Sequence, residues 1–312
     1  MERVIIIGGG PAGLSAGIFL CRDKIPTLII EKFSPGGNML LTEIIENYPG
    51  YPEGISGFDL AENMKKQFLK FGGQIKYGEV EKIQLRDNKK IIKLKNGQIL
   101  ESDVLIIASG CSRKKLGVKG EEEFIGKGVS FCAICDGAFF KDKEVAVIGG
   151  GDSAVEESIY LTRFAKIVYL IHRREELRAK RYLQEEVKKN EKIKFIIPYI
   201  VKEIKGKEKA ESLILQNTMK EENIELRIDG IFISVGHKPN TQFLNGLVKT
   251  NENGFIIVNE KMETNIKGIY ACGDVIKKSL YQIITAASEG MIAAFFAERY
   301  LENLVSNINL RS

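Results

Sequence analysis

Two stretches of the chain, residues 4–31 and 144–172, share one pattern of apolar and glycine-rich positions. In each, a short apolar run enters a glycine-rich turn, continues into a segment of helical character and ends in a second apolar run. The four runs are Val4–Ile7, Thr27–Ile30, Val145–Ile148 and Ile167–Ile171. Continuous apolar runs are typical of parallel strands buried on both faces. Each stretch therefore predicts a β-α-β unit with a glycine turn between strand and helix.

Strand patterns also follow each of these units. The pair Asn96-Gly97 separates two runs at 91–95 and 98–100, and this dipeptide favours a two-residue type I′ hairpin turn. Charged and apolar residues alternate through 202–226, which predicts further strands joined by a polar loop.

Each half then ends in a strand that runs into a glycine, at residues 104–110 and 228–236. The last segment, 254–304, contains a strand, a Gly-Asp turn and a long helix from about Gln282. It has no pattern of a separate fold, so we expect it to complete one of the two halves. The fold class is therefore α/β, with two Rossmann-like dinucleotide-binding domains.

Composition agrees with a globular protein of two domains. The 312 residues are 44% hydrophobic and 28% charged, and the net charge of +5 is small for this length. The charge is spread over both halves, which argues against nucleic-acid binding. No apolar run approaches the roughly 18 residues of a membrane helix, and the start of the chain lacks a signal-peptide pattern. We therefore expect a cytoplasmic protein with no nucleic-acid or membrane partner.

The first glycine turn has the G-x-G-x-x-G spacing, with Gly8, Gly10 and Gly13. These glycines allow a tight turn, close approach of the backbone to a pyrophosphate, and close packing of helix on strand. Glu31 ends the second strand, where a carboxylate suits a ribose diol and repels a 2′-phosphate. The alternative is a glycine turn without a ligand.

The second turn has the G-x-G-x-x-A variant, with Gly149, Gly151 and Ala154, and lacks the acid. His172 stands at the matching position, 23 residues after the first glycine in both stretches. It is followed by Arg173, Arg174 and Arg178. Guanidinium groups in place of the acid indicate a 2′-phosphate site and hence NADPH. The alternative is that these arginines form a solvated face.

Two sites with opposite ribose preferences imply two cofactors in one chain. Flavin and NADPH are the sensible pair, because a flavin can take a hydride and pass electrons on.

Cys132 and Cys135 form a C-x-x-C motif, followed directly by Asp136. This spacing permits a redox disulfide, and a neighbouring carboxyl group can protonate a departing thiolate. A zinc site needs a second pair of ligands that the sequence does not offer, so we expect no metal. We expect the other three cysteines, Cys21, Cys111 and Cys272, to be small buried residues. The alternative for Asp136 is a simple turn residue.

Over essentially its whole length, the chain resembles the low-molecular-weight thioredoxin reductases of bacteria. The resemblance rests on the segments 8–13, 46–50, 132–137, 149–154, 172–178, 236–240, 270–274 and 282–285. It implies an NADPH-dependent thioredoxin-disulfide reductase with FAD and NADPH as cofactors. It further implies three-layer ββα domains, with an NADPH domain of residues 113–241 inserted in an FAD domain of residues 1–112 and 242–312.

The resemblance also implies the residues of each site. For FAD they are Gly8, Gly10, Pro11, Ala12, Gly13, Glu31, Gly36, Gly37, Asn38, Asn47, Ser109, Gly110, Asp274, Gln282 and Ile283. For NADPH they are Gly149, Gly151, Asp152, Ser153, Ala154, His172, Arg173, Arg174, Arg178 and Gly236.

In the implied mechanism, electrons pass from NADPH through FAD to the Cys132–Cys135 disulfide and then to oxidised thioredoxin. Cys135 would face the flavin, Cys132 would form a transient mixed disulfide with thioredoxin, and Asp136 would protonate a thiolate. The resemblance also implies that the protein is a homodimer. Three positions depart from the family pattern: Asn38 for Gln, Ser109 for Thr, and Tyr281 for Arg.

Other functions remain open from the residues alone. The dithiol could serve another small disulfide protein. Relatives that oxidise small dithiols or take electrons from ferredoxin do not need the arginine cluster. A non-enzymatic NADPH sensor would keep both dinucleotide sites without turnover.

Overall fold

The computed structural model describes residues 3–42, 44–87 and 89–309, and the chain forms two compact units. Unit 1 comprises Met1–Ser112 and Lys238–Ser312, and unit 2 comprises Arg113–His237. Unit 2 is therefore an insertion in unit 1. Residues 238–241, which we expected in the inserted domain, belong to unit 1. There Asn240 Nδ2 donates to the carbonyl of Ser109 at 2.9 Å, and Ser109 Oγ donates to the carbonyl of Asn240 at 2.8 Å.

Unit 1 is built on a five-stranded parallel sheet in the order β18-β7-β1-β2-β3. The strands are β1 Val4–Ile7, β2 Thr27–Glu31, β3 Gln74–Tyr77, β7 Val104–Ile107 and β18 Ile269–Ala271. Val4 is in register with Thr27 on one side and with Val104 on the other. Because β1 is central, the turn that follows it opens at the carboxyl edge of the sheet.

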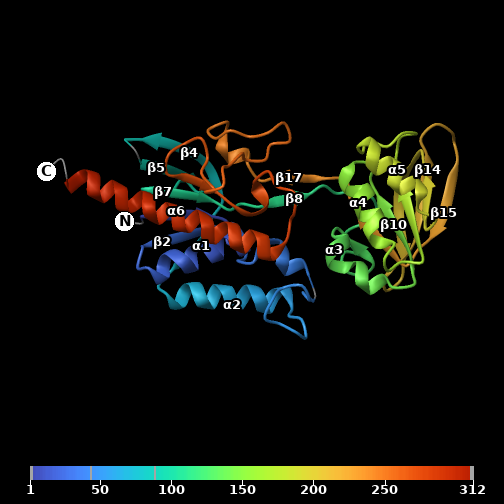
Figure 1. Cartoon of the computed structure of the whole chain (residues 1–312), viewed down its shortest axis with the longest axis horizontal. Coiled ribbons are helices and arrows are strands. Elements are labelled where there is room, and N and C mark those ends of the chain that lie inside the picture. Colours follow the sequence, from blue (N-terminus) through green and yellow to red (C-terminus); the bar gives the residue numbers. More distant parts are fainter. Residues whose placement is uncertain (1–2, 43, 88, 310–312) are drawn as a thin grey trace. The chain divides into compact units, whose positions relative to one another are not determined.

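The two faces of this sheet carry different layers (Figure 1). One face packs against α1 Pro11–Arg22, α2 Gly57–Lys70 and α6 Ile283–Asn309. The other packs against an antiparallel sheet of β4 Val80–Arg86, β5 Lys89–Leu94 and β6 Ile99–Ser102. Successive side chains of β1 alternate between the layers, since Val4 and Ile6 join the helical core and Ile5 and Ile7 the other.

Unit 2 repeats this three-layer plan. Its parallel sheet has the order β12-β11-β10-β16-β9, with Val145 and Val147 facing the helices and Ala146 and Ile148 facing the antiparallel sheet. The parallel strands are β9 Val129–Ser130, β10 Glu144–Ile148, β11 Ile167–Ile171, β12 Ile193–Ile196 and β16 Gly230–Ile233. The covering elements are α4 Asp152–Leu161, α5 Arg181–Lys189, β13 Tyr199–Gly206, β14 Ala210–Asn217 and β15 Asn223–Arg227. The expected fold of two Rossmann-like ββα domains is confirmed.

The remaining elements are short. Strands β8 Cys111–Arg113 and β17 His237–Pro239 pair as a two-stranded sheet, and α3 spans Ala133–Asp136. Within the described ranges, 3₁₀ helices span Gly37–Leu41, Gly137–Phe140, Gln242–Leu244 and Gly273–Val275. None of the helices in the described part of the chain is long and apolar enough to cross a membrane.

The hairpin turn at Asn96-Gly97 differs from the expected type I′ geometry. A type I′ turn needs positive φ at both central residues, but of this pair only Gly97 has it, at 87°. The Gly97 amide donates to the carbonyl of Leu94 at 3.0 Å, and the Leu94 amide donates to the carbonyl of Gln98 at 2.9 Å. The loop is therefore one residue longer, with glycine in the left-handed position that closes it.

The close contact between α1 and β1 yields a stability prediction. A Cβ added at Gly13 would lie 1.9 Å from the Gly8 carbonyl oxygen, whereas one at Gly10 would meet nothing within 4 Å. Backbone atoms cannot move aside cheaply, so we expect Gly13→Ala to lower the free energy of unfolding by roughly 1–3 kcal/mol. Urea unfolding measures the change, with Gly10→Ala as the matched control. Equal stability of the two variants would contradict the close packing.

Candidate active site

The Gly8–Gly13 turn lies at the carboxyl edge of the unit 1 sheet. Gly8 has φ 103° and lies against the Ala108 carbonyl, so this position excludes any larger side chain. Gly10 is the N-cap residue of α1, and Pro11 begins the helix. Among the described residues, no side chain caps this helix end. The turn therefore presents a positive helix terminus beside an open glycine, which suits a pyrophosphate.

Glu31 lies on this turn. Its Oε2 accepts from the Gly9 amide at 2.7 Å, and its Oε1 accepts from the Phe33 amide at 2.9 Å. Two backbone amides thus fix the carboxylate at the point where β2 ends. A fixed negative charge here favours the hydroxyl groups of a ribose over a 2′-phosphate.

The segment 36–38 is tied to the same turn. The Gly36 amide donates to the Gly9 carbonyl at 2.7 Å, and Gly36 and Gly37 have φ of 127° and 57°. Asn38 Nδ2 donates to the carbonyl of Cys111 at 3.0 Å. The shorter side chain at the usual Gln position therefore has a definite partner in unit 1.

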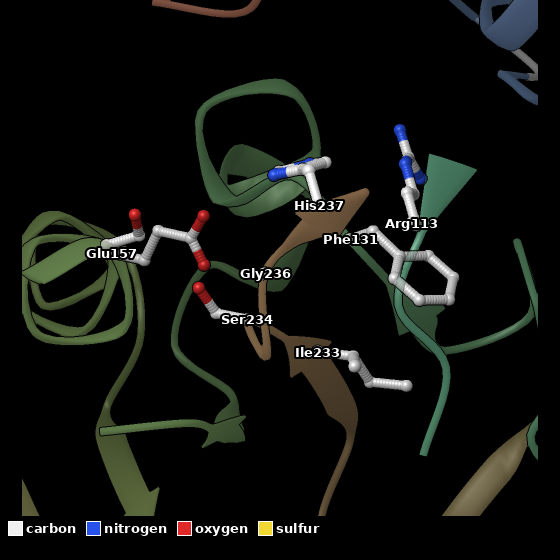
Figure 2. Close-up of a pocket in the computed structure, with 8 residues that line it drawn as sticks. Arg113, Phe131, Glu157, Ile233, Ser234, Gly236 and His237 are labelled. Carbon is white, nitrogen blue, oxygen red and sulfur yellow. The ribbon is translucent and has the colours of Figure 1, made fainter. Parts of the chain in front are cut away.

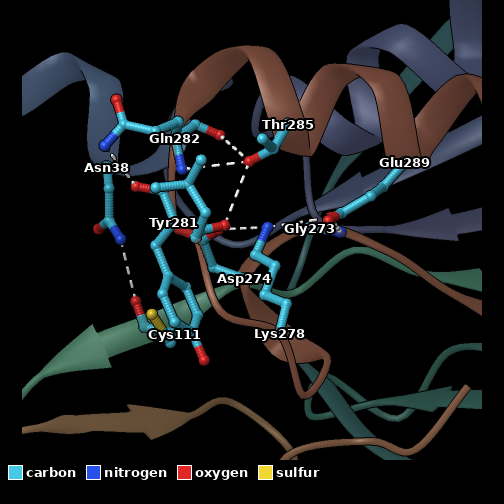
Figure 3. Close-up of polar contacts among 10 residues, drawn as sticks. Asn38, Cys111, Gly273, Asp274, Lys278, Tyr281, Gln282, Thr285 and Glu289 are labelled. Atoms are coloured by element: carbon cyan, nitrogen blue, oxygen red, sulfur yellow. Dashed lines mark hydrogen bonds and ion pairs between the residues drawn. The ribbon is translucent and has the colours of Figure 1, made fainter. Parts of the chain in front are cut away.

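Two further groups of expected FAD residues border α6 (Figure 3). Asn47 Nδ2 donates to Gln282 Oε1 at 3.1 Å, and the Gln282 amide donates to Thr285 Oγ1 at 3.2 Å, just before α6 begins at Ile283. Asp274 follows Gly273, whose added Cβ would lie 2.8 Å from Ala12 Cβ in the first turn of α1. Unit 1 therefore brings the ends of β1, β2, β7 and β18 to one region beside α1 and α6.

The second glycine turn has the same construction in unit 2. Gly149 has φ 159° and lies against the Ser234 carbonyl, and a Cβ at Gly151 would meet nothing within 4 Å. Asp152 begins α4, and its Oδ1 accepts from the Lys180 amide at 2.8 Å. Ala154 is fully buried below the turn.

His172 packs on the middle glycine of this turn. A Cβ at Gly150 would lie 2.3 Å from His172 Nδ1, and the Gly150 carbonyl accepts from the Arg178 amide at 2.7 Å. Burial and then the charges of Arg178, Arg173 and Arg174 lower the pKa of His172. The imidazole is therefore neutral at pH 7, and the three exposed arginines carry the positive charge of this edge.

Cys132 and Cys135 form a disulfide at the start of α3. Cys132 is the N-cap residue, and its Sγ accepts from the Cys135 amide at 3.2 Å. The Cys132 amide donates to Ser130 Oγ at 3.0 Å, and Ser130 Oγ donates to Asp136 Oδ2 at 2.5 Å. A hydrogen-bonded chain therefore links the first cysteine to the carboxylate that follows the second. Cys21, Cys111 and Cys272 are buried and reduced, as expected.

A pocket in unit 2 contains a residue that sequence reasoning missed (Figure 2). Glu157 on α4 points towards Ser234 and the pocket. Burial raises the pKa of Glu157 to about 7, although Ser234 and the charge of Arg113 oppose the shift. Its Oε2 is buried and makes no hydrogen bond within the described chain. The complete lining is Arg113, Phe131, Ser153, Glu157, Ile233, Ser234, Gly236 and His237.

Glu157 could have been found from the helix pattern. Ala154, Val155, Ser158 and Leu161 form the buried face of α4, and Glu157 lies on it one turn after Ala154. A carboxylate on an apolar helix face is costly unless it has a partner. An unsatisfied acceptor beside a glycine turn therefore fits a ligand that brings hydrogen-bond donors.

The carboxyl edges of the two parallel sheets have the open glycine turns and the polar groups that dinucleotides need. In unit 1, Gly10 is open, the α1 terminus is uncapped by described side chains, and Glu31 supplies a carboxylate. In unit 2, Gly151 is open, the three arginines lie at the end of β11, and Glu157 Oε2 lacks a donor within the described chain. These residues fit FAD in unit 1 and NADPH in unit 2.

Comparison with known proteins gives a consistent result. Residues 2–290 match the model of the pyridine nucleotide-disulphide oxidoreductase family. Thioredoxin reductase of Bacillus subtilis is 45% identical over 302 residues, covering 96% of this chain and 95% of the relative. Thioredoxin reductase of Listeria innocua is 45% identical over 303 residues, covering 96% and 94%.

A solved structure agrees with these sequences. Thioredoxin reductase from Streptococcus pyogenes superposes with a TM-score of 0.92 at 43% identity, over 97% of this chain and 99% of that one. Because sequence and structure match over nearly the full length, the chain belongs to the pyridine nucleotide-disulphide oxidoreductase family, among the thioredoxin reductases.

Proposed function

We propose that this protein reduces the disulfide of oxidised thioredoxin with electrons from NADPH, through FAD and its own Cys132–Cys135 pair. The observation that carries the proposal is the Cys132–Cys135 disulfide, which lies in the same unit as the arginine-flanked glycine turn. The relatives named thioredoxin reductase, at 45% identity over nearly the whole chain, support it.

In this proposal unit 1 binds FAD and unit 2 binds NADPH. The sign of the charge at the end of the second strand supports the assignment, because Glu31 repels a 2′-phosphate and Arg173, Arg174 and Arg178 attract one. Exclusion of NADPH from unit 1 is as important as its selection by unit 2, since both turns would otherwise compete for the same nucleotide.

The chain's own residues hold the cofactors. The α1 and α4 termini would bind the pyrophosphates, Glu31 would bind the FAD ribose, and Glu157 would accept from the amide group of nicotinamide. Asn38, Asn47, Ser109, Asp274 and Gln282 complete the FAD site. When bound, FAD takes a hydride from NADPH and passes an electron pair to a disulfide.

The dithiol carries out the exchange. Two electrons and one proton, which bound FAD would pass on from the hydride of NADPH, would convert the Cys132–Cys135 disulfide into a Cys132 thiolate and a Cys135 thiol. The Cys132 thiolate, which the Cys135 amide stabilises, attacks the partner disulfide and forms a mixed disulfide. Cys135 then attacks Cys132, which re-forms the internal disulfide and releases reduced thioredoxin. Asp136 takes the proton from the Cys135 thiol as that sulfur attacks and passes it to the departing thioredoxin thiolate.

We further propose that the protein acts in the cytoplasm as a homodimer. Both statements come from the resemblance to the low-molecular-weight thioredoxin reductases of bacteria.

Activity provides the first test. Purified protein should oxidise NADPH when a bacterial thioredoxin and an excess of a terminal disulfide are present, and Cys135→Ser should reduce this turnover by at least about 10³-fold, because an essential covalent group is lost. Absorbance of NADPH and of the flavin measures both steps. Cys21→Ser is the matched control and should keep turnover.

The outcomes separate the alternatives. Flavin reduction by NADPH without thioredoxin turnover would indicate another disulfide partner. If the protein bound flavin but turned over with none of the disulfide acceptors tested, a non-enzymatic NADPH sensor would be favoured.

Nucleotide preference tests the arginine cluster. Arg173→Ala combined with Arg178→Ala should weaken NADPH binding by about 10²-fold and leave NADH binding nearly unchanged, because each charged hydrogen bond to the 2′-phosphate contributes about 1.5–3 kcal/mol. Titration of each nucleotide measures the ratio of dissociation constants. Arg227→Ala, which removes an exposed arginine of β15, should leave the ratio intact. An unchanged ratio in the double variant would make these arginines a solvated face.

The raised pKa of Glu157 predicts how stability depends on pH. The folded chain holds this proton up to about pH 7, whereas an ordinary glutamate, at 4.5, loses it earlier. The folded state therefore binds more protons in this window, and its stability falls as pH rises from about 4.5 through 7. Glu157→Gln should abolish this loss and stabilise the nucleotide-free protein by up to about 3 kcal/mol at pH 8.

Urea unfolding at pH 5 and pH 8 checks this difference, with exposed Glu156→Gln as the control. NADPH affinity in the same variants tests the proposed role, since the ionised carboxylate accepts from the nicotinamide amide. The wild-type affinity should rise with pH through about 7, and that of Glu157→Gln should not. A parallel pH dependence in both proteins would exclude Glu157 from nucleotide binding.

A further inference from the structure

A buried cation lies at the centre of the polar network beside α6 (Figure 3). Lys278 Nζ is 3.0 Å from Asp274 Oδ1 and 2.9 Å from Glu289 Oε2. Only 9% of the Lys278 side chain is exposed, compared with 26% for Asp274 and 15% for Glu289. An ammonium group this enclosed requires paired acids, and both acids in turn require it.

Glu289 links this cation to the backbone that carries Asp274. Its Oε2 accepts from the Gly273 amide at 2.9 Å as well as from Lys278. Burial raises the pKa of Glu289, and the charge and hydrogen bond of Lys278 oppose that shift. Without Lys278, the two carboxylates would face each other across a poorly solvated space, and Glu289 would tend to take up a proton.

Tyr281 covers the network from a third side. Its ring centroid is 5.4 Å from Lys278 Nζ, and it also packs against Phe255 at 6.1 Å. Burial, with smaller contributions from Cys111 and Asp274, raises the pKa of Tyr281 to about 12, so the phenol stays neutral. A neutral aromatic ring excludes water, and its electron-rich face attracts the ammonium group. Both effects strengthen the ion pairs of Lys278.

The network is held against the glycine turn of unit 1. Gly273 approaches Ala12 so closely that an added Cβ would lie 2.8 Å from Ala12 Cβ, and one at Gly290 would lie 2.1 Å from the Ala12 carbonyl. Glu289 precedes Gly290 on α6, and Asp274 follows Gly273. Both acids are therefore anchored at positions whose distance from the turn is fixed by backbone contact.

We propose that Lys278 is a positioning residue for FAD, which acts by fixing the Asp274 carboxylate beside the Gly8–Gly13 turn. The inference rests on the proposed function, in which Asp274 is one of the residues that complete the FAD site. Lys278 and Glu289 set the direction of that carboxylate, through the ion pair of Lys278 with Asp274 and the hydrogen bond of the Gly273 amide to Glu289. They need not contact the cofactor themselves.

FAD affinity of the full chain tests this role. The flavin is removed, and the apoprotein is titrated with FAD while flavin fluorescence reports binding. Lys278→Met should raise the dissociation constant at least tenfold, and Lys278→Arg, which keeps the charge, should recover most of the affinity. Lys277→Met is the matched control, because Lys277 is the exposed neighbour of the same type.

A double variant separates positioning from a general structural effect. If Lys278 acts through Asp274, Lys278→Met should weaken binding no further once Asp274→Asn is present. Fully additive losses would overturn the proposal, and so would equal affinity of Lys278→Met and Lys277→Met. A proportional fall in the urea midpoint of the Lys278→Met apoprotein, with no rescue by Lys278→Arg, would also overturn it.

The experiments distinguish a failure of the proposed function from a failure of this inference. If the wild-type chain bound no FAD, the thioredoxin reductase proposal itself would be wrong. If the wild type bound FAD and turned over thioredoxin while the Lys278 variants behaved as the control, only the role of Lys278 would be lost.

Discussion

The structure depends on one steric constraint, which is the contact between the first turn of a helix and the strand that precedes it. In unit 1 the Gly8 carbonyl oxygen would lie 1.9 Å from any Cβ at Gly13, and in unit 2 the Cβ of Ala154 would lie 2.6 Å from one at Gly149. This contact directs the helix terminus towards the carboxyl edge of the sheet. Phosphate binding, ribose selection and the approach of α6 to Ala12 all follow from that placement.

The two units use the same contact with opposite electrostatics. Matching residues lie on the middle glycine of the turn in both units: Glu31, the last residue of β2, accepts from the Gly9 amide, and the ring of His172, which follows β11, packs on Gly150. A carboxylate there makes the edge of unit 1 negative. A neutral imidazole leaves the charge of unit 2 to its arginines. The change at this one position explains how one architecture can bind two different dinucleotides in the same chain.

Periodicity and motif spacing predicted the two parallel sheets, their glycine turns and the redox pair, because these depend on local pattern and short spacing. The Asn96-Gly97 turn was wrong by one residue, since hairpin registers are set by cross-strand bonds such as Leu94 to Gln98. Residues 238–241 joined unit 1 through Asn240 and Ser109, which are distant in sequence. Lys278 was missed because its significance comes from burial between Asp274 and Glu289, whereas the pattern of α4 already contained a signal for Glu157.

The dithiol shows how far such tertiary detail shapes the chemistry. Ser130 Oγ accepts from the Cys132 amide, so its hydroxyl proton is directed to Asp136 Oδ2 and cannot serve a sulfur. The two hydrogen bonds of Ser130 therefore tie the Asp136 carboxylate to the backbone of Cys132. The Cys135 amide meanwhile points at Cys132 Sγ, which favours negative charge on that sulfur once the disulfide opens. The local backbone therefore distinguishes two chemically identical cysteines, in the direction that the proposed exchange through Cys132 requires.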